Sequence, residues 1–364
     1  MRTRMSLKRS AAVAVLAVVP AGLVGLGAPA SAASAQTATL KHGTLVVTGT
    51  LGADLVDIAV ARSQVTVDFG RDGTIDAHFP LHRVVDISVR QGAGNDVSSV
   101  TGTGTVPVAI VSGTGEDQVK VVGHIGRRGT GDAPTSISTQ GGKDQVQAVT
   151  PGPVTINTGG GPDSVEGGGA AAGAEAVNLG GGDDFFRSSM GSFIGKRSDT
   201  VVGGPGTDAI EVDGTWESDR VELAARVGHL IVTHDQRDSI DSVGVENVSY
   251  ESSNSAESDG RGDTVIVGDL TGTGVQRFTP DFGIDSQHRA PNTSADSLIV
   301  TGTSGVDHIR VSGSGQDVLV DGLSTRITPI WLQPTDLLEI DTRGSRDDVD
   351  SSGLQQGLVQ LVVR

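Results

Sequence analysis

The sequence predicts an all-β fold, a parallel β-solenoid of the β-roll or β-helix type with flanking irregular β modules. Three observations support this prediction. The 364-residue chain contains 53 glycines and only 3% aromatic residues, it is rich in short segments that alternate Val or Ile with polar residues, and a Gly-Asp turn recurs at a regular spacing. Alternating apolar residues bounded by glycine are typical of half-buried strands, and self-similarity at about 20 to 50 residues is typical of stacked repeats.

The predicted strands are short, and glycine or polar residues separate them. β-branched residues dominate these segments, so we expect many short strands and few helices. They include Thr44–Val47, Val65–Val67, Val84–Val89, Val106–Val111 and Val154–Ile156.

Six Gly-Asp turns define the repeat in the middle of the chain. Their closing aspartates lie 21, 27, 19, 21 and 24 residues apart, about one solenoid coil each. A carboxylate is therefore expected to return to the same edge of the stack on successive coils. The turns are Gly92–Asp96, Gly113–Asp117, Gly141–Asp144, Gly159–Asp163, Gly180–Asp184 and Gly203–Asp208.

A cation is the simplest way to stabilise such a row of carboxylates. Neighbouring coils are stacked about 4.8 Å apart, so like charges on successive turns repel unless a positive charge lies between them. Glycine permits positive φ and tight turns, which lets backbone carbonyl oxygens point inward beside the carboxylate. Carboxylate and carbonyl oxygens are the ligands that Ca²⁺ prefers, and the pattern therefore predicts calcium ions between successive turns.

These turns resemble the hemolysin-type calcium-binding repeat, or RTX repeat, whose pattern is G-G-x-G-x-D-x-U-x with U a large apolar residue. Gly203–Ile210 matches the pattern throughout, and Val97, Val119, Val146 and Val165 supply the apolar residue after other turns. The resemblance implies that calcium is held by the closing carboxylates and by glycine carbonyl oxygens of neighbouring turns. Because the motif occurs about once per coil, we expect a one-sided ladder with at most five ions between six turns. The implied metal ligands are Asp96, Asp117, Asp144, Asp163, Asp184 and Asp208, together with Gly92, Gly94, Gly113, Gly115, Gly159, Gly161, Gly180, Gly182, Gly204 and Gly206.

Related turns lie outside this central ladder, at Gly49–Asp54 and Gly302–Asp307 and, less clearly, at Gly262-Asp263 and Arg346–Asp348. We therefore expect an N-terminal β module over residues 36–90, the calcium-binding solenoid over 91–212, and a C-terminal β module with degenerate repeats over 213–364. The C-terminal part is expected to continue as an irregular solenoid or to form a separate β-domain.

The first residues predict secretion. Arg2, Arg4, Lys8 and Arg9 precede the apolar run Ala11–Val19, and small residues end at Ala32, so residues 1–32 are interpreted as a Sec-type signal peptide. Its removal changes the formal net charge from −17 to −21. A chain this acidic is a poor partner for nucleic acid. The rest of the sequence contains no apolar run long enough to span a bilayer.

Two other interpretations stay open. Asp and Gly are ordinary turn residues, so a metal-free structural solenoid would show similar turns. A calcium-dependent lyase or hydrolase acting on polysaccharide could also use a β-helix with clustered carboxylates. The eight histidines are scattered, however, and neither a Ser-His-Asp grouping nor an HExxH motif is present. We therefore expect no catalytic residues and a structural or adhesive role.

Overall fold

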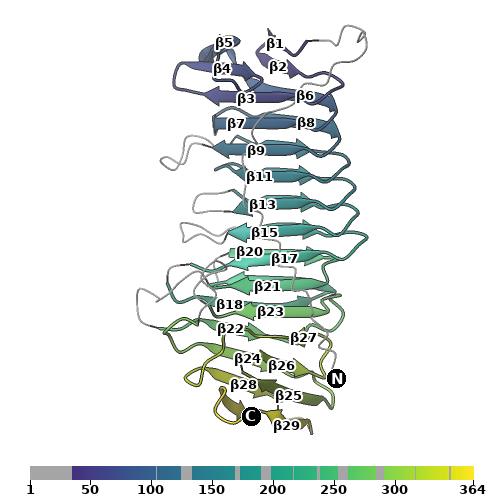
Figure 1. Ribbon diagram of the computed structural model, residues 1–364, viewed down its shortest axis with the longest axis vertical. Coiled ribbons are helices and arrows are strands. Elements are labelled where there is room, and N and C mark those ends of the chain that lie inside the picture. Colours follow the sequence, from purple (N-terminus) through teal and green to yellow (C-terminus); the bar gives the residue numbers. More distant parts are fainter. Residues whose placement is uncertain are drawn as a thin grey trace, which may run out of the picture. The chain divides into compact units, whose positions relative to one another are not determined.

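The computed structural model describes residues 35–364 except 104, 124–132, 169–172, 190–197, 216, 236–237, 253–260, 284–290, 316 and 344–345. Residues 34–364 form one compact unit. The described residues form 30 β-strands and one short 3-10 helix at Leu81–Arg83, which confirms the predicted all-β solenoid class (Figure 1). The proposed signal peptide lies outside the described residues.

The strands form two sheets of 15 strands each. Sheet A contains, in spatial order, β1 (Thr37–Lys41), β2 (Thr44–Thr48), β6 (Asp86–Ala93), β8 (Val108–Thr114), β10 (Thr135–Ser138), β12 (Val154–Asn157), β14 (Glu175–Asn178), β16 (Ser198–Val202), β20 (Asp238–Val243), β19 (His229–His234), β18 (Arg220–Arg226), β22 (Thr264–Val267), β24 (Ser297–Thr301), β28 (Leu337–Asp341) and β30 (Gln360–Val363). Sheet B contains β29 (Asp348–Leu354), β25 (His308–Ser314), β26 (Asp317–Asp321), β27 (Arg326–Ile327), β23 (Arg277–Asp281), β21 (Asn247–Glu251), β17 (Ala209–Asp213), β15 (Phe185–Ser189), β13 (Ser164–Gly168), β11 (Gln145–Val149), β9 (Gln118–Gly123), β7 (Val97–Thr103), β3 (Leu55–Val60), β4 (Gln64–Phe69) and β5 (Ala77–Pro80).

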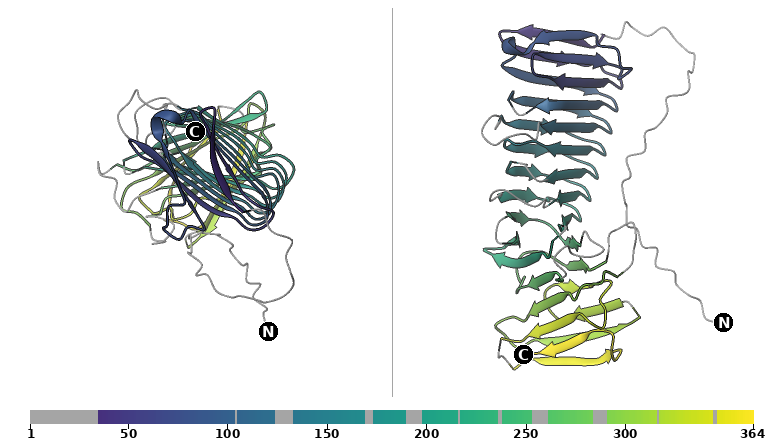
Figure 2. Two further views of the ribbon diagram at one scale, coloured as in Figure 1. Left: turned by 90° about the horizontal axis from the view of Figure 1, so that it is seen from above. Right: turned by 90° about the vertical axis from the view of Figure 1, so that its left-hand side faces the viewer.

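In the regular part of the stack the chain alternates between the sheets, so one strand of each sheet makes one coil. Strand β8, for example, pairs in parallel with β6 of the preceding coil and β10 of the next. The strands consequently lie one above another like rungs (Figure 2). Strand pairing continues across residue 90, through β6 with β8, and across residue 212, through β17 with β21.

Period-2 alternation points one face of every strand into the stack, where identical positions of successive coils pack together. Such columns of apolar residues form the core, and each residue of the two columns named next is at most 3% exposed. One column of sheet A contains Ile110, Ile137, Ile156, Val177 and Val201, and one of sheet B contains Val119, Val146, Val165, Phe186, Ile210, Val248 and Phe278.

We call the edge where the chain passes from sheet A to sheet B the first edge, and the edge where it passes back the second edge. The six Gly-Asp turns all connect a strand of sheet A to the following strand of sheet B, so they share the first edge. The second-edge connections differ in length, from Val149–Val154 to Gly123–Thr135. The unequal spacing of the aspartates thus arises on the opposite edge from the carboxylates.

Three antiparallel meanders interrupt the regular coils: β3-β4-β5, β18-β19-β20 and β25-β26-β27. Each follows a Gly-Thr-x-x-x-Asp turn, at Gly49–Asp54, Gly214–Asp219 and Gly302–Asp307. The middle turn leads from sheet B to sheet A and therefore lies on the second edge.

Candidate metal centre

The six predicted aspartates form one continuous row of buried carboxylates along the first edge. Each side chain is at most 2% exposed. The backbone N–H of each aspartate donates to Oδ1 of the aspartate on the next coil, over 2.8 to 3.0 Å from Asp96 to Asp208. Asp54 extends the row at one end by donating to Asp96, and at the other end Asp208 donates to Oε2 of Glu246.

The second oxygen of each of these carboxylates is the unusual feature of the row. Oδ2 is buried and has no hydrogen-bond partner in Asp96, Asp117, Asp144, Asp163, Asp184 and Asp208. Leaving a buried polar oxygen without a partner is costly, and the great majority of such atoms in folded proteins are paired. The same unpaired oxygen on six successive coils therefore indicates that the row is completed by something other than the chain itself.

Burial dominates the electrostatics of the row. Removal of the carboxylates from water raises the pKa of Asp117, Asp163 and Asp208 to about 6, and neighbouring carboxylates add to this effect. The pKa values of Asp96, Asp144 and Asp184 are raised for the same first reason. Without a counter-ion, the row at neutral pH therefore carries negative charges that burial and the neighbouring carboxylates destabilise.

This charge leads to a prediction for the protein in chelator. Asp117, Asp163 and Asp208 have a pKa of about 6 in the folded chain, whereas the ordinary pKa of an aspartate is 3.8, so between these pH values the folded state binds more protons than the unfolded state. The free energy of unfolding should then fall as pH rises from about 4 to about 6, by roughly 1 to 3 kcal/mol per group. Urea unfolding in EDTA at pH 4.5 and 7.5 measures this difference. Greater stability at pH 7.5 would contradict the prediction.

The glycines of these turns are required by close backbone contacts. At each of the ten predicted glycines an added Cβ would lie within 1.5 to 2.6 Å of a backbone atom of the preceding coil. Nine of the ten have positive φ, the exception being Gly92. At Gly161, for example, φ is 122° and the Cβ would lie 1.7 Å from the carbonyl oxygen of Gly142. The turns thus bring backbone carbonyl oxygens of one coil directly against the next.

The turn also wraps around its own carboxylate. A Cβ on Gly203, five residues before Asp208, would lie 2.5 Å from Oδ2 of that aspartate. The unpartnered oxygen therefore faces the inside of the turn rather than solvent. An ion that bound this oxygen would be enclosed by the turn backbone.

The Gly-Thr-x-x-x-Asp turns provide an internal comparison. Thr50, Thr215 and Thr303 each donate their backbone N–H to Oδ2 of the closing aspartate, at 2.5 to 2.7 Å, and their hydroxyl to Oδ1. In the six Gly-Asp turns, the residue at the position of this threonine has no side-chain hydroxyl. Threonine therefore satisfies the carboxylate from within the chain in these three turns, whereas all six Gly-Asp turns retain an unpartnered Oδ2.

The less regular turns predicted from sequence fall on both edges. Asp347 lies on the first edge, where its Oδ1 accepts the backbone N–H of Asp307 at 2.9 Å. Asp263 lies on the second edge, in a separate row with Asp219, Asp296 and Asp336 that is linked in the same way. The closing aspartates from Asp96 to Asp208 therefore share the first edge. The second edge has the pair Glu175 and Asp199, in which the Glu175 N–H donates to Asp199 Oδ1, and the row from Asp219 to Asp336.

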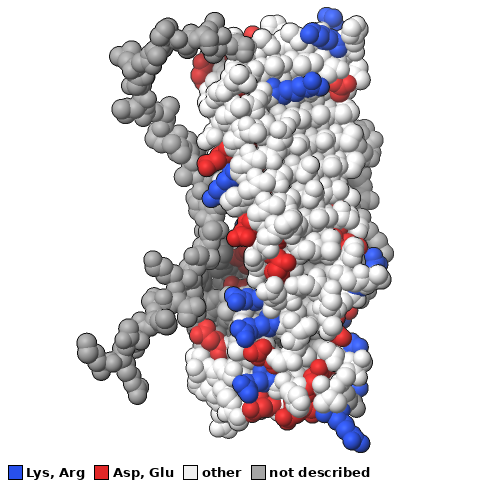
Figure 3. Space-filling model, turned by 90° about the vertical axis from the view of Figure 1, so that its right-hand side faces the viewer, with Lys and Arg blue, Asp and Glu red and all other residues white. Residues whose placement is uncertain are grey.

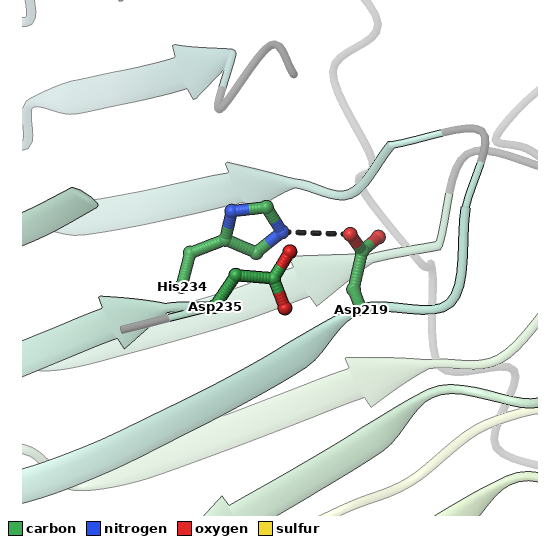
Figure 4. A group of neighbouring side chains, drawn as sticks. All are labelled: Asp219, His234 and Asp235. Carbon is green, nitrogen blue, oxygen red and sulfur yellow. Dashed lines mark hydrogen bonds and ion pairs between the residues drawn. The ribbon is translucent and has the colours of Figure 1, made fainter. Parts of the chain in front are cut away.

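Asp219, His234 and Asp235 lie close enough together to hold an ion (Figure 4). Asp219 is nevertheless already bonded by donors of the chain: His234 Nε2 lies 2.7 Å from Oδ1, and the Tyr250 hydroxyl lies 3.2 Å from Oδ2. Burial by itself would lower the pKa of His234, but the hydrogen bond and charge of Asp219 outweigh burial and raise it. Asp219, His234 and Tyr250 therefore form a buried hydrogen-bond network at one end of the row from Asp219 to Asp336.

A third acidic group on sheet B was not found from the sequence. From β15, Arg187 contacts carboxylates on the two strands that follow in the stack: Asp213 at 2.8 Å and Glu211 at 3.2 Å on β17, and Glu251 at 4.0 Å on β21. Burial, followed by the charge of Asp213, raises the pKa of Glu211 to about 7. Only the strand register, which places Arg187 beside Glu211, identifies this group.

On one side of the molecule, few charged side chains are visible over the middle of the stack (Figure 3).

A scan against models of known protein families finds no match to this chain, and no curated protein shows significant similarity to it. Among the described residues, no helix is long and apolar enough to cross a membrane.

Proposed function

We propose that this protein is a secreted calcium-binding β-solenoid with a structural or adhesive role, in which ions lie between the Gly-Asp turns from Asp96 to Asp208. One observation carries the proposal: the buried, unpartnered Oδ2 that recurs in all six of these turns, against the satisfied carboxylates of the Gly-Thr turns. The resemblance of the turns to RTX repeats agrees with it.

The available donors suit calcium. The six turns offer carboxylate and backbone carbonyl oxygens, and Ca²⁺ accepts 6 to 8 oxygen ligands, about 2.3 to 2.6 Å away, in flexible geometry. Zn²⁺ and Cu²⁺ prefer nitrogen or sulfur ligands, and Mg²⁺ requires a nearly ideal octahedron. The residues that would hold the ions are the closing aspartates, assisted by glycine carbonyl oxygens. A bound cation would neutralise carboxylates that burial otherwise penalises.

Isothermal titration calorimetry and native mass spectrometry of the purified protein test the proposal. We expect up to five bound calcium ions, with calcium still binding in a tenfold excess of magnesium. Failure to bind calcium at millimolar concentration would overturn it.

Enzymatic action on polysaccharide is the second candidate, and the Arg187 group is the observation that bears on it. A basic residue among carboxylates on a parallel sheet could in principle abstract a proton. Burial lowers the pKa of Arg187, but the hydrogen bond and charge of Asp213 and the charge of Glu211 outweigh burial and raise it. These contacts keep the guanidinium protonated, which is the opposite of what a general base requires. The geometry therefore favours a stabilising role for Arg187.

A further inference from the structure

The residues five positions before each closing aspartate form a second row inside the first edge. We call it the inner row: Gln91, Ser112, Thr139, Thr158, Leu179 and Gly203. Its side chains point into the stack, and those from Ser112 to Leu179 are fully buried. Strand register places Gln91 beside Ser112, since their neighbours Gly92 and Gly113 are paired.

The inner row lies against the carboxylates. Thr139 and Thr158 lie close enough to the aspartates of their own turns, Asp144 and Asp163, for their side chains to oppose the rise in the pKa of these carboxyls. A side chain at this position is therefore placed to contribute an oxygen atom beside the carboxylate. Along the row this capacity declines, because Leu179 and Gly203 have no polar side-chain atom.

The first two members of the row differ from the others by having no partner for a polar atom. Thr139 Oγ1 donates to the carbonyl oxygen of Thr158 at 3.1 Å, and Thr158 Oγ1 donates to that of Leu179. Ser112 Oγ, which is fully buried, has no hydrogen-bond partner.

Gln91 is similarly placed. Its Oε1 accepts a hydrogen bond from Ser98 Oγ at 2.8 Å, while its Nε2 is buried without a partner. The oxygen and nitrogen positions of a glutamine amide are assigned from the hydrogen bonds around them, and the two can be exchanged. Rotated by 180°, the amide would donate to Ser98 and present its oxygen, instead of its nitrogen, at the unpartnered position. The gap between the first two turns then offers side-chain oxygens from Gln91 and Ser112 in addition to those of Asp96 and Asp117.

From this arrangement we propose, on the basis of the proposed function, that the calcium sites are graded and that the gap between Asp96 and Asp117 binds calcium most tightly. Ca²⁺ takes 6 to 8 oxygen ligands, so a protein oxygen already held at a site by the fold can replace a water molecule that would otherwise complete the shell. The inner row supplies two unpartnered polar side chains at this gap and none in the turns closed by Asp184 and Asp208. Affinity should therefore fall along the row toward Asp208.

Calcium titration calorimetry of the full chain tests the gradient. The wild-type isotherm should show a tight class of about one site followed by weaker sites. Ser112→Ala should weaken the tight class about tenfold, whereas Ser136→Ala, an exposed serine on the neighbouring strand β10, should leave the isotherm unchanged. Equal melting temperatures in EDTA for the wild type and both variants would exclude a folding defect.

A wild-type isotherm with equivalent sites, or an unchanged one in Ser112→Ala, would overturn the gradient while leaving calcium binding intact; water alone between Gln91 and Ser112 in a calcium-soaked crystal would do the same. Absence of calcium binding in the wild type would overturn both proposals.

Discussion

Replacing Gly161 by alanine is expected to disrupt the stack, whereas the same change at the adjacent Gly160 is expected to be tolerated. At Gly161 the new methyl group would lie 1.7 Å from the carbonyl oxygen of Gly142, on a backbone with φ of 122°. Overlap and unfavourable φ each cost about 1 to 3 kcal/mol, so we expect a loss of roughly 3 kcal/mol or more in the free energy of unfolding.

Gly160 is the matched control for this prediction. Its nearest contact for an added Cβ is the carbonyl oxygen of Gly181 at 3.8 Å, an ordinary van der Waals distance. Urea unfolding of the two variants in EDTA measures the difference without any contribution from calcium. Similar stabilities for Gly160→Ala and Gly161→Ala would show that the turns are not stacked as closely as described.

Asp184→Asn is expected to change stability in opposite directions with and without calcium. The backbone N–H of Asp163 donates to Oδ1 of Asp184 at 2.8 Å, and the side-chain oxygen of asparagine can accept the same hydrogen bond. The substitution also removes the negative charge of a carboxyl group whose pKa is raised by burial. In EDTA at neutral pH the melting temperature should therefore stay the same or rise by a few degrees. In millimolar calcium it should fall by several degrees, because a charged ligand is lost.

Asp183→Asn is the control for this variant. Asp183 is next to Asp184 in the chain but exposed, and its Oδ1 accepts the N–H of Thr207 at 2.9 Å, which asparagine can also do. Its effect should be small in both conditions. If the difference in melting temperature between Asp184→Asn and the wild type were the same in EDTA and in calcium, the row would be a metal-free structural feature.

The regular part of the fold could be predicted because period and turn chemistry agree there. Alternating Val and Ile identify the strands, Gly and Asp mark the first-edge turns, and their recurrence at coil length predicts the stack. The burial of each closing aspartate could not be predicted in the same way. Whether Oδ2 of Asp163 finds a donor depends on the backbone of its own turn, which a one-dimensional pattern does not describe.

The irregular part was harder to predict for topological reasons. Gly214–Asp219 has the same pattern as Gly49–Asp54 but follows a strand of sheet B, so its carboxylate lies on the opposite edge. Sequence does not show which sheet a strand joins, and it therefore does not show on which edge the turn between two strands lies. Glu246, at the end of the first-edge row, was missed because a glutamate without neighbouring Gly-Gly does not match the repeat.

The inner row was also missed, although its spacing is constant. Ser112 and Gln91 are unremarkable polar residues in strand segments, and only strand register brings them together with the carboxylates. A search for residues at a fixed distance before each closing aspartate would have identified the row.

Thermal melting of the wild-type protein in EDTA and in a calcium titration, with magnesium as control, tests the central claim most directly. At calcium tenfold above the dissociation constant, each independent site adds about 1.4 kcal/mol. Several filled sites should therefore raise the melting temperature on the order of 10 °C, and magnesium should not reproduce the increase. Identical melting curves in EDTA and in millimolar calcium would contradict the claim that the Gly-Asp turns bind calcium.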